Sequence, residues 1–326
     1  MKTISIVIPV YNEEENIRTA YRRVAAVMEG LAGRYDYEII FTDNHSTDRT
    51  FEIVRELSET DHRVRGVRFS RNFGYQRSIL TGYLMSSGDA VVQVDCDMED
   101  PPEMITQFVE KWEQGYLVVY GVRASRKESR GRALMRKVFY RLIDAMSEDD
   151  LPHDAGDFRL VDRRIVHELG KYYDCSPYIR GAVASMGFEQ IGISYDRDRR
   201  QAGRSKFNFF ANLRLAADGI LNHSVVPLRV ASFVGFLSFM ATIVMALVYL
   251  LGKLYFGASW PPGFTTLTLL LLASISLNAM FLGVLGEYIG KIFHQVKRRQ
   301  MTIIERTINI DVRDQGWWQN GSAAGG

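Results

Sequence analysis

The sequence predicts an α/β protein: a mostly parallel sheet domain over the first two thirds of the chain, followed by two transmembrane helices. Short apolar runs rich in β-branched residues recur about every 25 to 35 residues, which is the length of a βα unit. Stretches with the apolar period of an α-helix separate these runs. Alternating strands and helices form parallel sheets that are covered by helices on both faces. Two long uncharged runs then follow nearer the C-terminus.

The strands and helices of the sheet domain can be placed from these patterns. Strands are predicted at residues 4–10, 38–42, 64–69, 90–94 and 117–120. The first helix carries one apolar face and has Asn12 as its predicted N-cap; the face consists of Ile17, Ala20, Val24, Val27 and Leu31. A second helix is expected after Thr47 or Asp48, with Ile53, Val54 and Leu57 on its apolar face. Pro101, Pro102 and Glu103 are expected to open a further helix, because proline and acidic residues suit a first turn.

The C-terminal third contains two runs that are long enough to cross a membrane. Residues 230–252 carry no charged side chain, and after Lys253 a second uncharged run covers residues 254–286. A bilayer core needs about 20 apolar residues in a helix, and soluble helices rarely stay uncharged for so long. We therefore predict transmembrane helices near 230–252 and 265–289. The predicted organisation is a sheet domain at 1–203, amphipathic juxtamembrane helices at 204–229, a membrane region at 230–291 and a tail at 292–326.

Basic side chains flank the membrane region on both outer sides. Those before it are Arg204, Lys206, Arg214 and Arg229, and those after it are Lys291, Lys297, Arg298 and Arg299. The connection between the two spans carries only Lys253. Because basic flanks stay in the cytoplasm, the sequence predicts an integral protein of the inner or plasma membrane whose sheet domain and tail are both cytoplasmic.

Composition excludes several classes of protein. The 40 basic and 38 acidic residues give a net charge of +2, which does not predict nucleic-acid binding. Two cysteines, Cys96 and Cys175, provide no disulfide framework and fit a reducing compartment. The first apolar run ends at Pro9 and becomes acidic without a small-residue cleavage site, so we expect a strand there and no secretory signal.

The stretch from Val91 to Glu103 is the first candidate for chemistry. A buried strand ends there in Asp95, Cys96 and Asp97. Two carboxylates one residue apart can share a hard cation, and Mg²⁺ or Mn²⁺ bound in this way completes its coordination with substrate phosphate oxygens. Alternation along the strand points Cys96 away from the two acids, so it is expected to pack in the core. The competing interpretation is an ordinary turn with solvated acids.

Two other strand ends deliver polar side chains to the same predicted edge of the sheet. The first strand is followed by Tyr11 and Glu13, and the second by Asp43. Ligands of such sheets bind beyond the carboxyl ends of the strands, and these groups suit a base and a ribose. The sequence has no GxGxxG after the first strand and no P-loop, which argues against a dinucleotide or a P-loop nucleotide. A nucleotide beside a metal-bound diphosphate is therefore predicted, whereas the scattered histidines predict no histidine metal site.

Several motifs together resemble the inverting GT-A (Rossmann-like) glycosyltransferases of family 2. They are PVYNEEENI, DNHSTDRT, SRNFGYQRS and DCDMEDPPE. With GDFRL at 156–160, RQAGRSKF at 200–207 and two C-terminal spans, the chain is similar to the polyprenyl-phosphate glycosyltransferases of the GtrB type, which are related to dolichol-phosphate mannose synthase. The resemblance extends from about residue 3 to 300, and its motifs are specific only jointly.

This resemblance implies roles for individual residues. The nucleoside would contact Pro9, Tyr11, Glu13 and Asp43; the metal diphosphate would lie on Asp95 and Asp97; and Asp157 would serve at the reacting centre together with Asp97. The acceptor phosphate would contact Arg123, Arg126, Lys127, Arg200, Ser205 and Lys206. Relatives commonly show DDGS where this chain has Asp43, Asn44, His45 and Ser46, and a lysine where it has Tyr75. These departures bear on the donor base and sugar more than on the reaction class.

The function that the resemblance implies is transfer of a hexose to a membrane polyprenyl phosphate with inversion. Glucose from UDP-glucose is the expected donor sugar, for glycosylation of the cell envelope or an O-antigen, and the protein is expected to be a homo-oligomer that requires Mg²⁺ or Mn²⁺. GDP-mannose or a UDP-aminosugar are alternative donors. A membrane-anchored protein that binds nucleotide sugars without catalysis is the alternative of another class.

Overall fold

The computed structural model describes residues 1–123, 155–172, 177–196, 226–256, 263–297 and 300–310. The chain divides into two compact units. Of the described residues, the first unit contains 1–123, 155–172, 177–196 and 300–310, and the second contains 226–256 and 263–297.

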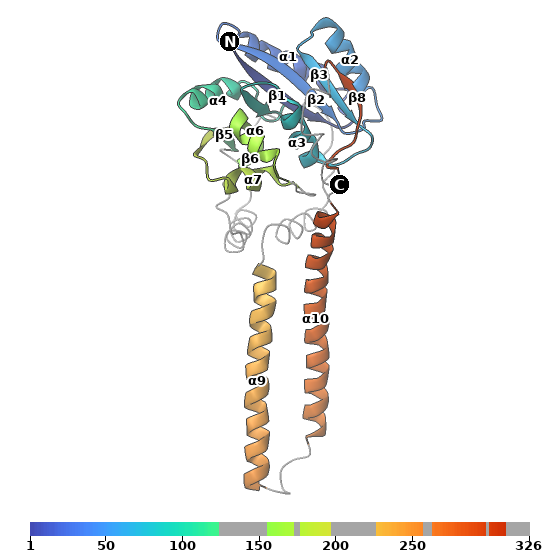
Figure 1. The fold of residues 1–326 in the computed structure, drawn as a ribbon, viewed down its shortest axis with the longest axis vertical. Coiled ribbons are helices and arrows are strands. Elements are labelled where there is room, and N and C mark those ends of the chain that lie inside the picture. The colour runs from blue at the N-terminus through green and yellow to red at the C-terminus, as the bar shows by residue number, and fades with distance from the viewer. Residues whose placement is uncertain (124–154, 173–176, 197–225, 257–262, 298–299, 311–326) are drawn as a thin grey trace, which may run out of the picture. The chain divides into compact units, whose positions relative to one another are not determined.

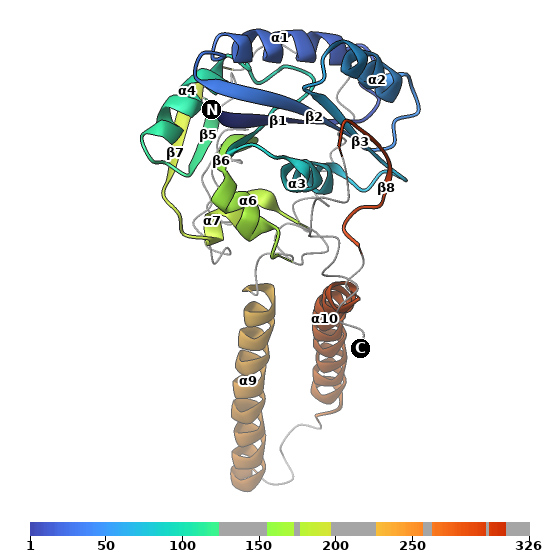
Figure 2. The same ribbon diagram turned by 45° about the horizontal axis from the view of Figure 1, so that its top comes forward.

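The first unit is built on an eight-stranded sheet with the order β7-β5-β6-β4-β1-β2-β3-β8 (Figures 1 and 2). The strands are β1 Lys2–Val10, β2 Tyr35–Asp43, β3 Val64–Phe69, β4 Ala90–Gln93, β5 Val118–Arg123, β6 Ala155–Asp162, β7 Gln190–Tyr195 and β8 Ile304–Ile308. β1 pairs in parallel with β2 and β4, and β2 with β3. Among the strands in the described part of the chain, only β6 and β8 run antiparallel to their neighbours. The predicted mostly parallel α/β sheet is confirmed.

Helices cover both faces of this sheet, as Figure 2 shows with α1 and α2 above it and α3, α6 and α7 below it. The helices are α1 Ile17–Glu29, α2 Thr50–Thr60, α3 Tyr75–Met85, α4 Met104–Glu113, α6 Arg163–Leu169 and α7 Ile179–Ser185. Side chains that alternate along β1 point to opposite faces of the sheet and contribute to two separate hydrophobic cores. Ile4, Ile6 and Ile8 pack with α1 and α4, whereas Val7 packs with α3. Because both faces are buried, the central strands are apolar throughout.

The start of the first helix differs from the prediction. α1 begins at Ile17, so Asn12 is too far upstream to be its N-cap. Asn12 instead adopts a left-handed backbone with φ of 54°, and its side-chain oxygen accepts a hydrogen bond from the Thr47 N–H at 2.8 Å. Asparagine tolerates this conformation better than most residues do, which explains its place in the turn. The second helix begins at Thr50, whose N–H donates to Asp48 Oδ1 at 3.0 Å.

The second unit contains the two long helices α9, Val226–Phe256, and α10, Phe264–Val296. Within them, Val230–Gly252 and Leu270–Gly290 are long and apolar enough to cross a membrane, with mean hydropathies of 2.3 and 1.7. Their apolar side chains are exposed, for example Leu254 at 78% and Leu267 at 67%. A soluble protein would not expose so many large apolar side chains together, so these surfaces suit a lipid environment.

The range predicted as a C-terminal tail contains more structure than expected. α10 continues to Val296, and β8 then joins the sheet of the first unit as an edge strand antiparallel to β3. The missing side chain of Gly66 leaves room for Ile308, because a Cβ at Gly66 would lie 3.1 Å from its Cδ1 atom. The prediction missed β8 because its partner strand lies more than 200 residues earlier in the chain.

The pairing of β8 with β3 has a consequence for membrane topology. The two strands belong to one sheet, yet both long helices separate them in the chain. If α9 and α10 each cross a membrane, both ends of this segment must lie on the same side. We expect Glu59→Cys in α2 and Ala258→Cys, between the helices and outside the described residues, to react with impermeant thiol reagents from opposite faces. Labelling of both from one face would contradict two crossings.

Candidate active site

The carboxyl ends of β4, β1 and β2 lie side by side and bring the predicted acidic residues to one edge of the sheet. β1 is the middle of these three strands, and Val10 at its end is paired with Asp43 at the end of β2. On the other side, β4 leads into Asp95 and Asp97. The strand-end residues predicted to form one site are therefore neighbours in the sheet, as expected of parallel strands.

Asp95 is held by two side chains that sequence reasoning did not select. The Tyr75 hydroxyl donates a short hydrogen bond to Asp95 Oδ1, and Gln93 Nε2 donates to the same oxygen at 2.8 Å. Burial raises the pKa of Asp95 to about 7, although the hydrogen bond from Tyr75 lowers it. The negative charges of Asp100, Asp97 and Asp157 contribute to this rise. The Asp95 carboxylate therefore lies in a strongly negative environment.

This environment fits a divalent cation. Among the residues that the structure describes, no group of three His, Cys, Asp or Glu side chains forms a complete metal cage. A site with two carboxylates, Asp95 and Asp97, leaves coordination positions for phosphate oxygens and water, as Mg²⁺ sites in nucleotide-binding enzymes do. A cation there would also offset the mutual repulsion of the acids that raises the pKa of Asp95. The donor set is therefore suited to Mg²⁺ or Mn²⁺ bound together with a substrate diphosphate.

The turn after β4 places Cys96, which lies between the two acids, in the core. Cys96 is 4% exposed and packs in the same core cluster as α1 and α4, as predicted. Burial raises the pKa of its thiol well above the usual value, so it is not a candidate nucleophile. Met98 has a φ of 54°, and Asp97 Oδ1 accepts a hydrogen bond from the Glu99 N–H at 3.2 Å. This local bond fixes one oxygen of Asp97 at the turn.

Asp157 on β6 completes the acidic cluster. Gln76 Nε2 donates to its Oδ2 atom at 3.2 Å, and Arg180 Nε lies 3.3 Å from its Oδ1 atom. The antiparallel pairing of β6 with β4 brings it close enough to Asp95 to raise the pKa of that residue. The side chain of Asp157 is 17% exposed, so it can still meet a ligand. Gln76 lies within the SRNFGYQRS motif, but no role was assigned to it from the sequence. Arg180 was missed because no recognisable motif surrounds it.

Asp43 is buried at the end of β2 and has two strong partners. The Ser46 N–H donates to its Oδ1 atom at 2.9 Å, and Arg68 Nη1 donates to its Oδ2 atom at 2.8 Å. Burial raises the pKa of Asp43, whereas Ser46 and Arg68 lower it. Sequence reasoning missed Arg68, which lies within β3 rather than in a strand-end motif.

The other residues predicted to contact the nucleoside lie at the end of β1. Pro9 is buried within the strand, Tyr11 is 41% exposed, and Glu13 is half-buried. The Asn16 side chain donates to Glu13 Oε2 at 2.6 Å. Tyr11 is therefore partly exposed at this edge, and Glu13 forms a hydrogen bond at the start of its own helix.

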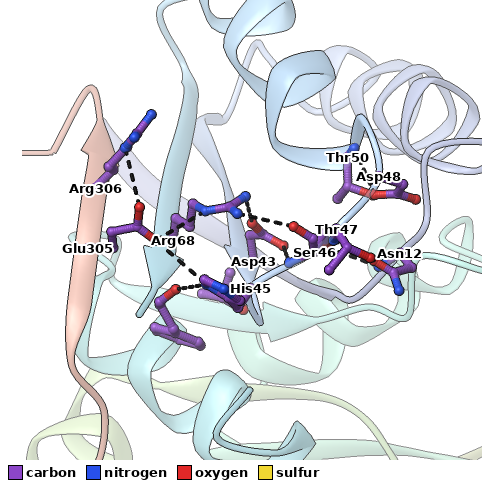
Figure 3. A network of polar contacts seen from close by, with 12 residues as sticks. Asn12, Asp43, His45, Ser46, Thr47, Asp48, Thr50, Arg68, Glu305 and Arg306 are labelled. Atoms are coloured by element: carbon purple, nitrogen blue, oxygen red, sulfur yellow. Dashed lines mark hydrogen bonds and ion pairs between the residues drawn. The ribbon is translucent and has the colours of Figure 1, made fainter. Parts of the chain in front are cut away.

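Hydrogen bonds join the turn after β1 to the turn after β2 at this edge of the sheet, as Figure 3 shows. The Asn12 N–H donates to Ser46 Oγ at 2.9 Å, and the Thr47 N–H donates to Asn12 Oδ1 at 2.8 Å. The Glu13 N–H donates to the Thr50 hydroxyl at 2.9 Å. These bonds join the turn after β1 to the turn after β2, so that Tyr11 and Asp43 are held in a fixed relation.

The residues predicted to bind the acceptor phosphate are only partly described. Arg123 ends β5, where its Nη2 atom lies 3.4 Å from Asp100 Oδ2, and the Tyr195 hydroxyl donates to Asp100 Oδ1 at 2.6 Å. Burial lowers the pKa of Arg123, but Tyr195 and Asp100 outweigh it, so the pKa is raised and the side chain stays charged. Its contact with the acceptor stays a prediction. Arg126, Lys127, Arg200, Ser205 and Lys206 lie outside the described residues.

Comparison with known proteins covers both the sheet unit and the long helices. Residues 5–170 match the family described as glycosyl transferase family 2. The Bacillus subtilis protein named uncharacterized glycosyltransferase YkcC is 40% identical over 311 residues, 94% of each chain. The bactoprenol glucosyl transferase of Shigella phage SfII is 34% identical over 93% of this chain and 98% of its own. Glucosyl-3-phosphoglycerate synthase from Mycobacterium tuberculosis, solved with Mn²⁺, UDP and phosphoglyceric acid, covers 68% of this chain and 76% of its own at 20% identity and a TM-score of 0.46.

Proposed function

Because the chain belongs to glycosyl transferase family 2, we propose that it transfers a hexose from a nucleotide sugar to a membrane polyprenyl phosphate. The observation that carries this proposal is the acidic edge formed by Asp95, Asp97 and Asp157 in a chain that also has two apolar helices. Relatives named bactoprenol glucosyl transferases span both parts of the chain, which favours glucose and a bactoprenol-type acceptor. The catalytic unit would then face the cytoplasm, where nucleotide sugars are found.

The donor is proposed to lie across the ends of β1, β2 and β4. Tyr11 would stack on the base, and Asp43 would accept a hydrogen bond from the base or the ribose. Asp95 and Asp97 would hold Mg²⁺ or Mn²⁺, which when bound supplies positive charge against the leaving diphosphate. Gln93 and Tyr75 keep the Asp95 carboxylate oriented toward this position through the hydrogen bonds described above.

The acceptor needs orientation more than activation. A phosphate monoester has a second pKa of about 6, so a polyprenyl phosphate is largely a dianion at neutral pH and can attack the anomeric carbon directly. Asp157, held by Gln76 and Arg180, would orient the reacting groups on the face opposite the diphosphate, and the reaction would proceed with inversion. This differs from a general-base role, which would place an abstracted proton on Asp157.

Incorporation of label into lipid tests the proposal. Purified protein would be incubated with undecaprenyl phosphate, Mg²⁺ and one radiolabelled donor at a time: UDP-glucose, GDP-mannose or UDP-N-acetylglucosamine. We expect the organic phase to gain label from UDP-glucose. Label from one of the other donors would keep the reaction class and correct the sugar. No label from these or further nucleotide sugars, with binding of the nucleotide intact, would favour a non-catalytic binding protein.

A further inference from the structure

The returning strand β8 places one acidic side chain against the predicted nucleoside site. Glu305 Oε2 lies 3.3 Å from Arg68 Nε and 3.6 Å from His45 Nδ1, as Figure 3 shows. The side chain is only 34% exposed, and its other oxygen lies 3.5 Å from Arg306 Nε. Glu305 therefore contacts two residues of the sheet edge that are separated from it by both long helices.

Arg68 contacts both Glu305 and Asp43 and so links the two acids. Its guanidinium uses Nε for Glu305, Nη1 for Asp43 Oδ2 at 2.8 Å and Nη2 for the Ser46 carbonyl oxygen at 3.1 Å. Three groups on different sides thus fix the plane of one rigid cation. Arg68 is 19% exposed and Asp43 fully buried, so water screens these charges less than it does at the surface.

Glu305 also contacts His45, which lies in the turn after β2. His45 has a left-handed backbone with φ of 64°, a conformation that few side-chain-bearing residues adopt. Its Nδ1 atom lies 3.0 Å from the Phe69 carbonyl oxygen, next to Glu305. From this turn the network continues through Ser46 to the N–H of Asn12, beside Tyr11. A continuous set of polar contacts therefore runs from β8 to both sides of the nucleoside site.

We propose that Glu305 is a positioning residue of the donor site, which acts through Arg68 and His45 to hold Asp43 and its turn in the geometry that binds the nucleoside. This inference rests on the proposed function. Without the Glu305 charge, Arg68 loses one of its three anchors and can rotate toward Asp43. The Asp43 oxygens that should meet the nucleoside then lose their fixed direction.

The strand does not need Glu305 to stay in the sheet. Its backbone pairs with β3, Ile308 packs over Gly66, and the Thr302 hydroxyl is buried 3.0 Å from that of Thr81. These contacts are independent of the Glu305 charge. A change that removes only this charge can therefore separate positioning from stability.

Titration of the full-length protein with UDP and with GDP, each with Mg²⁺, provides the test. Glu305→Gln should raise the dissociation constant of the nucleotide that the wild type binds by about fivefold to twentyfold, because a charge-assisted contact is lost. The KM of the nucleotide sugar should rise similarly, and the KM of polyprenyl phosphate should not change. Glu168→Gln is the matched control, because it removes the same charge from a surface pair with Lys171 in the same unit. It should change none of these values.

The outcomes separate the two proposals. If the wild type binds neither nucleotide, the proposed function falls and this inference falls with it. If the wild type binds one of them and Glu305→Gln binds it equally well, only the positioning role is wrong. Should Glu305→Gln unfold at a much lower temperature than the wild type, Glu305→Asp decides, because it keeps the charge on a shorter side chain. If Glu305→Asp binds the nucleotide as well as the wild type does even though its unfolding temperature is lowered, the charge matters and the positioning role is supported. If the affinity of both variants falls in proportion to their unfolding temperature, the positioning role is wrong.

Discussion

Replacing Asp95 or Asp97 with asparagine is expected to lower turnover by at least about a hundredfold while the sheet remains folded. Each substitution keeps the shape of the side chain and removes one negative charge from the position proposed for the cation. The leaving diphosphate would then lack the charge that stabilises it. Initial rates of lipid glycosylation, measured with and without EDTA, provide the test. Glu99→Gln, in the same turn, is the matched control and should retain most of the activity.

The Asp95 variant should also be more stable than the wild type in the absence of metal. The pKa of Asp95 is raised from its ordinary value of 3.8 to about 7 in the folded protein. Between these values the unfolded chain releases the proton while the folded protein keeps it, so the wild type loses stability as the pH rises from about 4 to 7. Asparagine removes this loss, which is on the order of 4 kcal/mol because one unit of pKa shift corresponds to about 1.4 kcal/mol.

Thermal unfolding in EDTA at pH 8 and at pH 4 measures this effect. The Asp95→Asn protein should unfold at a higher temperature than the wild type at pH 8, and the two should converge at pH 4. Near-normal turnover in both asparagine variants would overturn the metal assignment. A lower unfolding temperature at pH 8 would show that Asp95 stabilises the fold through its hydrogen bonds with Tyr75 and Gln93.

Asp157→Asn is expected to lower turnover by about a hundredfold or more, because it removes the charge that pairs with Arg180 and that is proposed to face the reacting groups. The pH profile of the residual activity then distinguishes orientation from base catalysis. If the acceptor dianion attacks directly, the rate of the variant should still rise through about pH 6, where the phosphate loses its second proton.

The turnover of the wild type should also rise through about pH 6, because this rise reflects ionisation of the acceptor phosphate and not of Asp157. If this rise through about pH 6 is absent in Asp157→Asn, Asp157 takes up a proton during the reaction. Arg180→Gln provides a second comparison, since it leaves the Asp157 carboxylate in place and removes its ion-pair partner. It should reduce turnover less than Asp157→Asn does.

Features encoded by local patterns were predicted well. The parallel strands could be placed because each is a short apolar run between helix-forming stretches. Asp43, Asp95 and Asp97 could be proposed for the candidate site because they stand at or directly after the ends of such runs. The same reasoning located both apolar helices and the packing role of Cys96. Asn12 was misassigned because residues that favour N-caps also favour turns, and only the position of Thr47 decides between them.

Features that depend on distant parts of the chain could not be predicted. Tyr75 was noticed only as a departure from relatives, and its hydrogen bond to Asp95 needs the sheet to bring α3 beside β4. Arg68 and Arg180 bind acids from other elements, and the sequence contains many arginines that could have done so. β8 was missed for the same reason, because pairing between strands so far apart leaves no local signal.

The order in which the chain is synthesised gives the β3–β8 pairing a further meaning. At about 5 to 20 residues per second, a ribosome needs roughly 10 to 50 s to proceed from the end of β3 to β8. During that time the outer edge of β3 is unpaired and open to other nascent strands. The edge closes only after both apolar helices have been made. If each helix crosses a membrane, a chain in which one of them fails to insert would leave its last strand on the other side, and its sheet would stay open to aggregation and proteolysis.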